Sequence, residues 1–229
     1  MKIIKDIKLN IDQEEVLRYQ GYNKKRVKAP NQNILQITEE EINRGYNLFK
    51  SQGLYSLIKI KSFASEGRII LENELTFRFA KSIIDQLKGS SHLLVGVVTI
   101  GGFLEKKVSE LFSQGEYPRA LALDAVGTVA VEDFSQKVRK FARQEVTEQG
   151  LKTSRHFSPG YGGWEVSQQE IIFKSISADN IGVRLTKGYM MLPQKSLSWI
   201  IGAGKEMIIS SEEDNNCGNC QSKCCNYKF

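Results

Sequence analysis

Apolar residues change their spacing along this chain, and the spacing predicts where strands and helices lie. Residues 93–100 are a continuous apolar run between glycines, which is typical of a strand buried on both faces. From 104 to about 148 the apolar residues follow a helical period that is broken at 115–118, which predicts one helix before the break and a long one after it. The second helix is crowded with small residues at 120–134, and small residues let a helix approach its neighbours closely. We therefore expect it to be a buried central helix.

The remaining elements are shorter and less regular. Asp12 is expected to cap a short helix that Gly21 ends. The capping box TEEE at 38–41 predicts the start of a second helix, which Gly53 would end. Further expected elements are strands at 2–9, 54–60, 68–71, 182–186 and 197–203, and helices at 75–87 and 167–176. Strands and helices do not alternate one by one, so we expect an α+β fold rather than a doubly wound α/β sheet.

Composition narrows the class of protein. The 229 residues, 41% of them hydrophobic and 25% charged, suit one main domain, which we place at 1–208, followed by a polar cysteine-rich tail at 209–229. The formal net charge is +6, but aromatic residues do not interleave with the basic ones as a base-stacking surface would require, and we expect no nucleic-acid partner. No segment has the apolar length of a signal peptide or a membrane span, so we expect a cytoplasmic protein without a membrane partner.

The most unusual segment is RHFSPGYGGW at 155–164. Three glycines leave backbone N–H groups accessible, Tyr161 and Trp164 have flat apolar rings, and Arg155 has five donors for a carboxylate. The segment could hold a small ligand that has a carboxylate and a flat ring. On the residues alone, a structural turn whose aromatic side chains fill the core is the favoured interpretation.

Three segments, in order along the chain, resemble the reactivation domain of cobalamin-dependent methionine synthase, and most of all its free-standing relatives. They are YPR at 117–119 with LDAVG at 123–127, RHFSPGY at 155–161, and GVRLT at 182–186 with YMMLP at 189–193. The resemblance covers about residues 90–205, with a weaker extension over 1–90. It implies an α+β fold with a strongly bent antiparallel sheet and helices packed on it.

The resemblance also implies that the chain binds S-adenosylmethionine in a shallow groove, and no G-x-G-x-x-G motif follows a predicted strand. In the family, an arginine before the Pro-Gly-Tyr turn holds the methionine carboxylate, and the turn holds the adenosyl part. These roles carry over to Arg155, Pro159, Gly160 and Tyr161. The spacing departs from that of methionine synthase, because Arg155 lies five residues before Gly160 instead of four, and His156 occupies the nearer position.

The implied function is reductive methylation, or reactivation, of cobalamin on a partner corrinoid protein such as a methionine synthase that lacks its own reactivation domain. The chain would then be a methyltransferase component that works with a low-potential electron donor. Methyl transfer from a sulfonium to cobalt needs no proton transfer, so His156 is interpreted as a loop residue rather than an acid or base. The alternative is a non-catalytic module that holds S-adenosylmethionine or caps a corrinoid protein.

All four cysteines of the chain lie in its last segment, at Cys217, Cys220, Cys224 and Cys225. Thiols this close together suit zinc or an iron–sulfur cluster, since a disulfide has little purpose in the cytosol. A tail of reactive thiols without metal is the competing interpretation.

Overall fold

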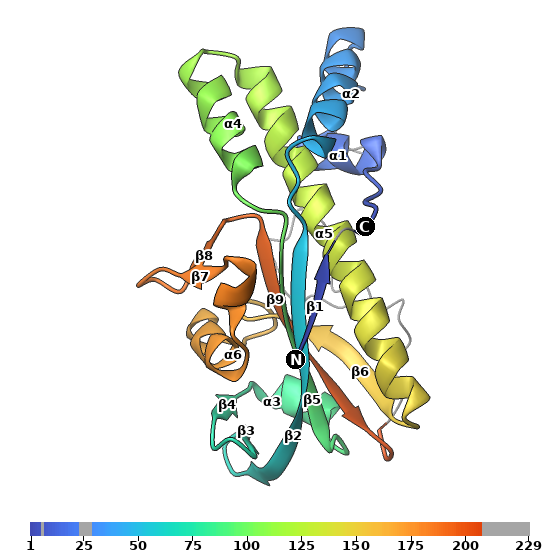
Figure 1. Cartoon of the computed structure of the whole chain (residues 1–229), viewed down its shortest axis with the longest axis vertical. Helices are drawn as coiled ribbons and strands as arrows, with labels where there is room; N and C mark the ends of the chain where they lie inside the picture. Colours follow the sequence, from blue (N-terminus) through green and yellow to red (C-terminus); the bar gives the residue numbers. More distant parts are fainter. Residues whose placement is uncertain (6, 23–28, 208–229) are drawn as a thin grey trace.

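A mixed antiparallel sheet and a set of helices form the protein (Figure 1), and the computed structural model describes residues 1–5, 7–22 and 29–207. The helices are α1 (Gln13–Tyr19), α2 (Gln32–Tyr46), α3 (Lys81–Leu87), α4 (Phe103–Ser113), α5 (Tyr117–Glu148) and α6 (Gln169–Ser175), with short 3-10 turns η1 (Val166–Gln168) and η2 (Ala178–Ile181). The strands are β1 (Lys2–Lys5), β2 (Gln52–Ala64), β3 (Arg68–Leu71), β4 (Thr76–Arg78), β5 (His92–Thr99), β6 (Lys152–Phe157), β7 (Arg184–Leu185), β8 (Met191–Leu192) and β9 (Ser196–Gly204). The predicted α+β class is confirmed.

The main sheet has seven strands in the order β4-β3-β2-β5-β9-β6, with β1 paired to β2, and all the pairings are antiparallel. The long strand β2 pairs with β5 along residues 52–59 and then with β3 along residues 60–64. The register shifts between Ile60 and Ser62, and such a bulge bends a strand and increases its twist. This change of direction lets one strand serve both the main sheet and the small β3–β4 extension.

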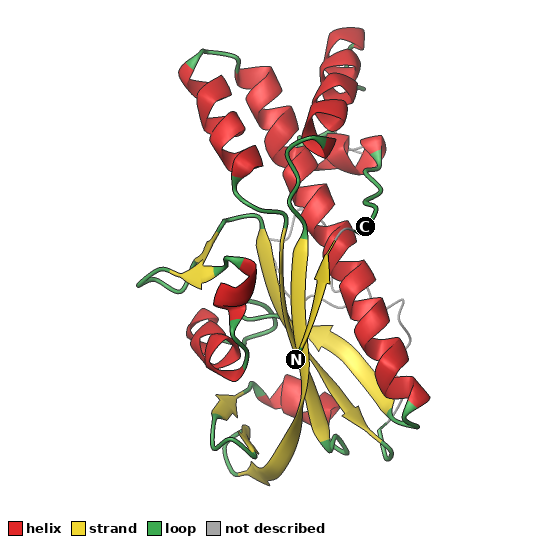
Figure 2. Ribbon diagram, viewed as in Figure 1, coloured by secondary structure: helices red, strands yellow, loops and turns green. Residues whose placement is uncertain are grey.

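Strand β5 is buried on both faces, which explains its continuous apolar sequence, and helices lie on both sides of the sheet (Figure 2). Leu94 and Val98 belong to the hydrophobic cluster on the side of α5, whereas Leu93, Val95 and Val97 belong to a second cluster that includes residues of α3 and α6. Successive side chains of a strand point to opposite faces, so a strand covered on both faces needs apolar residues at every position. The prediction for residues 93–100 is confirmed apart from one residue at each end.

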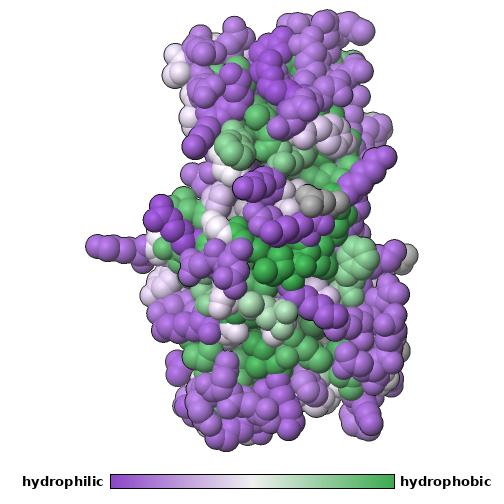
Figure 3. Space-filling model, in the orientation of Figure 1, coloured by the Kyte–Doolittle hydropathy of each residue, from purple (hydrophilic) through white to green (hydrophobic). Residues whose placement is uncertain are grey.

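Apolar side chains also reach the surface. Figure 3 shows them gathered over the central strands on the viewed face, between two polar ends. Ile3 on β1 is among the exposed large apolar residues. Within the described parts of the chain, no helix is both long and apolar enough to cross a membrane.

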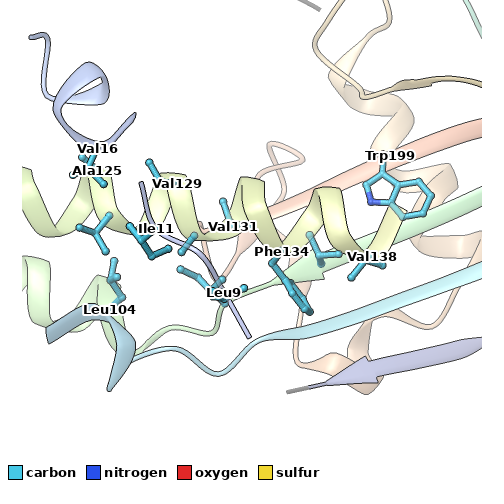
Figure 4. Packing of buried hydrophobic residues seen from close by; sticks show 14 of the residues in the cluster. Leu9, Ile11, Val16, Leu104, Ala125, Val129, Val131, Phe134, Val138 and Trp199 are labelled. Carbon is cyan, nitrogen blue, oxygen red and sulfur yellow. The ribbon is translucent and has the colours of Figure 1, made fainter. Parts of the chain in front are cut away.

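The long helix α5 packs along one face of the sheet and extends past the end of the strands. There, α2 and α4 pack against α5 (Figure 1). Figure 4 shows the apolar side chains Val129, Phe134 and Val138 of α5 within the hydrophobic cluster between α5 and the sheet. A Cβ atom added to Gly127 would lie 2.7 Å from Leu104 of α4, so a glycine is what allows that close approach. The predicted buried, small-residue central helix is confirmed.

Two predicted helix starts are wrong. Helix α2 begins at Gln32 rather than at Thr38, because the Asn31 side chain accepts a bond from the Ile34 N–H at 2.9 Å. Thr38 lies inside the helix and donates to the Ile34 carbonyl oxygen. The helix expected at 75–87 begins only at Lys81, since Phe77 pairs with Ile69 in the β3–β4 extension and is fully buried there.

Strand predictions differ at their ends and omit β4, β6 and β8. The strand expected at 2–9 ends at Lys5, the one at 54–60 extends over Gln52–Ala64, and Gly53 therefore lies in β2 instead of ending a helix. The strand expected at 182–186 is limited to Arg184–Leu185, which pairs with β8. Strand β6 was not predicted, and it contains Arg155 and His156. The interpretation of His156 as a loop residue is therefore wrong.

Candidate functional site

The turn at 158–164 connects β6 to η1 and α6 and is closed by its own backbone. The Gly160 N–H donates to the Trp164 carbonyl oxygen at 2.7 Å, and the Trp164 N–H donates to the Tyr161 carbonyl oxygen at 3.0 Å. Gly160 has a φ of 91°, a conformation that glycine adopts without strain, and open space lies where a side chain would point. The turn is thus a fixed structure with an open surface at Gly160.

Trp164 anchors this turn in the core. It is 1% exposed, and its ring centroid lies 4.8 Å from that of Phe79 and 6.0 Å from that of Phe77. The interpretation as a core-filling aromatic is therefore correct for Trp164. Tyr161, in contrast, is 69% exposed and leaves a ring accessible beside Gly160.

Arg155 lies three residues before the turn, on β6. Its guanidinium carbon lies 5.1 Å from the ring centroid of Phe157, in cation–π range. Its Nε atom is buried and has no hydrogen-bond partner in the described structure. A buried donor without a partner is unfavourable by about 1 to 3 kcal/mol, and a bound acceptor would remove that penalty.

Helix α6 joins the turn to the β7–β8 hairpin. The Gln169 side chain donates to the Tyr189 carbonyl oxygen at 2.9 Å and accepts from the Ser198 hydroxyl at 3.2 Å. Gln169 is buried, so these two bonds hold α6 against both β9 and the hairpin. The second and third resembling segments are therefore parts of one connected region.

The first resembling segment, at the start of α5, has a structural role. Arg119 donates to Glu41 at 2.8 Å and to Glu40 at 2.6 Å, and these ion pairs join α5 to α2. Asp124 forms an ion pair with Lys195 at 2.8 Å, and its side chain is half-exposed.

A second group of polar residues lies between α5 and β6, and the sequence analysis missed it. The pKa of His156 falls to about 3 because burial and the nearby charges of Arg139, Arg143 and Arg155 all oppose protonation. Burial and the charge of Arg143 together lower the pKa of Arg139 to about 10, against an opposing attraction by Glu132. Arginines four residues apart on a predicted helix are the sequence signal that could have pointed to this group.

The cysteines Cys217, Cys220, Cys224 and Cys225 lie outside the described residues. In the part of the chain that the structure describes, no group of three or more histidine, cysteine, aspartate or glutamate side chains could hold a metal ion. His92, the other histidine, contacts the Ser91 hydroxyl at the start of β5. The predicted metal ligands thus remain predictions.

Comparison with solved structures identifies the fold. The crystal structure of the MetH reactivation domain bound to AdoHcy matches with a TM-score of 0.61 and 11% sequence identity, over 92% of this chain and 80% of that one. This chain has a reactivation-domain-like fold. No protein-family model matches the sequence, and no curated protein sequence matches it either. At 11% identity the match establishes the fold and leaves the ligand and the reaction as proposals.

Proposed function

We propose that this protein binds S-adenosylmethionine and supports reductive methylation of cobalamin on a partner corrinoid protein, as a free-standing counterpart of a reactivation domain. The observation that carries the proposal is the fold shared over 92% of the chain with a reactivation domain bound to AdoHcy. AdoHcy is what remains of S-adenosylmethionine after its methyl group has been transferred. A fold that holds this product suggests a site for the methyl donor as well.

The residues around the 158–164 turn fit such a ligand chemically. The buried Arg155 Nε lacks a partner, and a guanidinium binds a carboxylate through two parallel N–H bonds. The open space at Gly160 allows a ligand to approach the backbone, and the exposed Tyr161 ring offers an aromatic surface for an adenine. Pro159 is buried and stiffens the turn between them. We assign ligand binding to Arg155, Pro159, Gly160 and Tyr161.

The contribution of this chain to the reaction is alignment rather than proton transfer. Bound S-adenosylmethionine supplies an already activated sulfonium methyl group, and the partner's reduced cobalamin is the nucleophile. Arg155 would orient the methionine end of the ligand, while the turn fixes the adenosyl end. Holding two reactants in line can by itself contribute roughly 7 to 11 kcal/mol to catalysis. The neutral His156 is not required as an acid or a base.

The partner must reach the ligand with its cobalamin domain, and a low-potential electron donor must reduce the cobalt. The apolar surface over the central strands in Figure 3 is a suitable contact area for a protein partner.

The experiment combines purified full-length protein, a cob(II)alamin-loaded corrinoid partner, a low-potential reductant and S-adenosylmethionine with a labelled methyl group. Labelled methylcobalamin should form only when all four components are present. Replacing labelled S-adenosylmethionine by S-adenosylhomocysteine is the matched control and should give none.

Two outcomes would separate this proposal from its alternative. Binding of S-adenosylmethionine without any labelled methylcobalamin would contradict the proposed reaction and favour a non-catalytic binding or capping module. Absence of S-adenosylmethionine binding, with or without the partner, would contradict the proposal and leave capping of a corrinoid protein as the alternative.

A further inference from the structure

Strand β6 contains a bulge at Ser154 and Arg155. Both residues lie opposite a single residue of β9, Gly202, because the regular pairing is interrupted between the two flanking pairs. Those pairs are Thr153 with Ala203 and His156 with Ile201. A bulge of this kind inserts one extra residue into a strand, bends the strand and can turn a side chain to the other face of the sheet.

The bulge decides which face of the sheet Arg155 reaches. Side chains alternate along a strand, so a regular β6 that kept Thr153 opposite Ala203 would place Arg155 on the α5 side, where Ala203 belongs to the cluster. The extra residue reverses this alternation. Arg155 lies instead on the side of Phe157, which belongs to the opposite cluster, and its guanidinium carbon is 5.1 Å from the Phe157 ring centroid.

The side chain of Ser154 holds this bulge in place. Ser154 is 2% exposed, and its hydroxyl accepts from the Gly202 N–H at 2.9 Å and donates to the Arg155 carbonyl oxygen at 2.6 Å. The Ser154 carbonyl oxygen accepts from Arg143 of α5 at 2.6 Å, so the bulge is also fixed from the helix. Removing the hydroxyl would remove the bond between the bulge and Gly202, and with it an interaction that favours the bulge over regular pairing.

We propose that Ser154 is a positioning residue for the ligand carboxylate, because its hydroxyl holds the bulge that directs the Arg155 guanidinium to the S-adenosylmethionine site. This inference rests on the proposed function, since the carboxylate is that of bound S-adenosylmethionine. The buried Arg155 Nε has no partner in the described structure, and a guanidinium makes two parallel bonds to a carboxylate only in one orientation. Ser154 acts through Arg155 and need not touch the ligand.

Calorimetry with two ligands tests the role of Ser154. S-adenosylmethionine carries the carboxylate and decarboxylated S-adenosylmethionine lacks it, so the ratio of the two affinities measures recognition of this group. The full-length wild type should prefer S-adenosylmethionine. Ser154→Ala should reduce that preference by about tenfold, with little change in the affinity for the decarboxylated ligand. Ser90→Ala, which removes a buried serine hydroxyl bonded to Met207 instead, is the matched control and should retain the preference.

An NMR measurement without ligand tests the bulge itself. The Nε–H signal of Arg155, assigned by its loss in Arg155→Lys, should move in Ser154→Ala because the guanidinium leaves the Phe157 ring. The same signal should stay in place in Ser90→Ala. If Ser154→Ala does not fold, Ser154→Cys keeps a weaker donor and acceptor at the same position and should show both changes to a smaller extent.

The outcomes separate this inference from the proposed function. If the wild type prefers S-adenosylmethionine and Ser154→Ala keeps that preference, or if the Arg155 signal does not move, the role of Ser154 is overturned and the proposed function stands. Equal affinity of the wild type for both ligands would also overturn the role of Ser154, because the carboxylate is then not recognised. A wild type that binds neither ligand would contradict the proposed function and, with it, this inference.

Discussion

Arg155 combines a charge, a buried donor without a partner in the described structure, and a position beside an open turn. If its guanidinium holds the methionine carboxylate, Arg155→Ala should weaken S-adenosylmethionine binding by about 1.5 to 3 kcal/mol, or roughly 10- to 150-fold in Kd. Isothermal titration calorimetry on the folded variant measures this loss. Arg68→Ala is the matched control and should leave the affinity unchanged.

The same titration decides the register of the site. His156→Ala should affect the ligand less than Arg155→Ala does, because His156 faces the α5 side of β6. A greater loss in His156→Ala would assign the ligand contact to the position four residues before Gly160.

Burial of His156 should also contribute to the decrease in stability at acid pH. The pKa of His156 is near 3 in the folded protein and 6.5 for an ordinary histidine, as in the unfolded chain. The unfolded chain therefore binds the proton first as the pH falls. The contribution to stability is complete above pH 6.5 and is lost as the pH decreases towards 3. Between pH 6.5 and 5, His156→Gln should therefore show a shallower decrease in unfolding free energy than the wild type, by up to about 1.4 kcal/mol per pH unit.

Urea unfolding at several pH values measures that slope. His92→Gln is the matched control, because burial lowers the pKa of His92 without the three arginines that surround His156. Equal slopes in the wild type and His156→Gln would contradict a buried neutral imidazole.

At the scale of elements, the contact between α2 and α5 depends on one buried carboxylate. The Glu41 side chain is fully buried, accepts a hydrogen bond from Arg119 of α5 and forms an ion pair with Arg44 of its own helix. Arg119→Leu should destabilise the protein by about 2 to 3 kcal/mol, because a buried charge would lose its partner on the neighbouring helix. Glu40→Gln, at an exposed position paired with the same arginine, should change stability by less than about 1 kcal/mol.

A double variant tests this explanation. Combining Arg119→Leu with Glu41→Leu should recover most of the lost stability in urea unfolding, since no charge remains buried without its partner. If the double variant is no more stable than Arg119→Leu, the loss of stability does not come from the unpaired charge of Glu41.

At the scale of the whole molecule, the cysteine tail and the folded domain should be independent. The described residues already form two large hydrophobic clusters, one on each side of the sheet. We expect Cys217, Cys220 and Cys224 to bind one metal ion or cluster, with Cys225 as the alternative fourth ligand. Replacing all four by serine should abolish metal content in elemental analysis, leave the thermal midpoint nearly unchanged and preserve S-adenosylmethionine binding.

The colour and metal of anaerobically purified protein then define the role of the tail. A brown colour would indicate an iron–sulfur cluster. If the serine replacements also prevent cobalamin reactivation by a weak electron donor, the tail transfers electrons to cobalt. Colourless zinc protein would restrict the tail to a structural role. Metal-free protein with four freely titratable thiols would contradict the site.

What the sequence determined by itself was local. The apolar run of β5, the break between α4 and α5, the small residues of α5 and the Asp12 cap each reflect a pattern within a few turns of chain, and each is confirmed. The irregular order of strands and helices indicated the α+β class, and the resemblance of three segments to a reactivation domain indicated the fold.

Only tertiary structure decided the rest, because those features depend on partners that are distant in sequence. Thr38 has the local pattern of a cap, yet the neighbouring Asn31 cap and the burial of Glu41 against α5 place it inside a helix. Strand β6 has no clear apolar alternation, and its pairing with β9 makes it a strand. The burial of Trp164 against Phe77 and Phe79, and the meeting of Arg139 and Arg143 with His156, arise from long-range packing that no local pattern records.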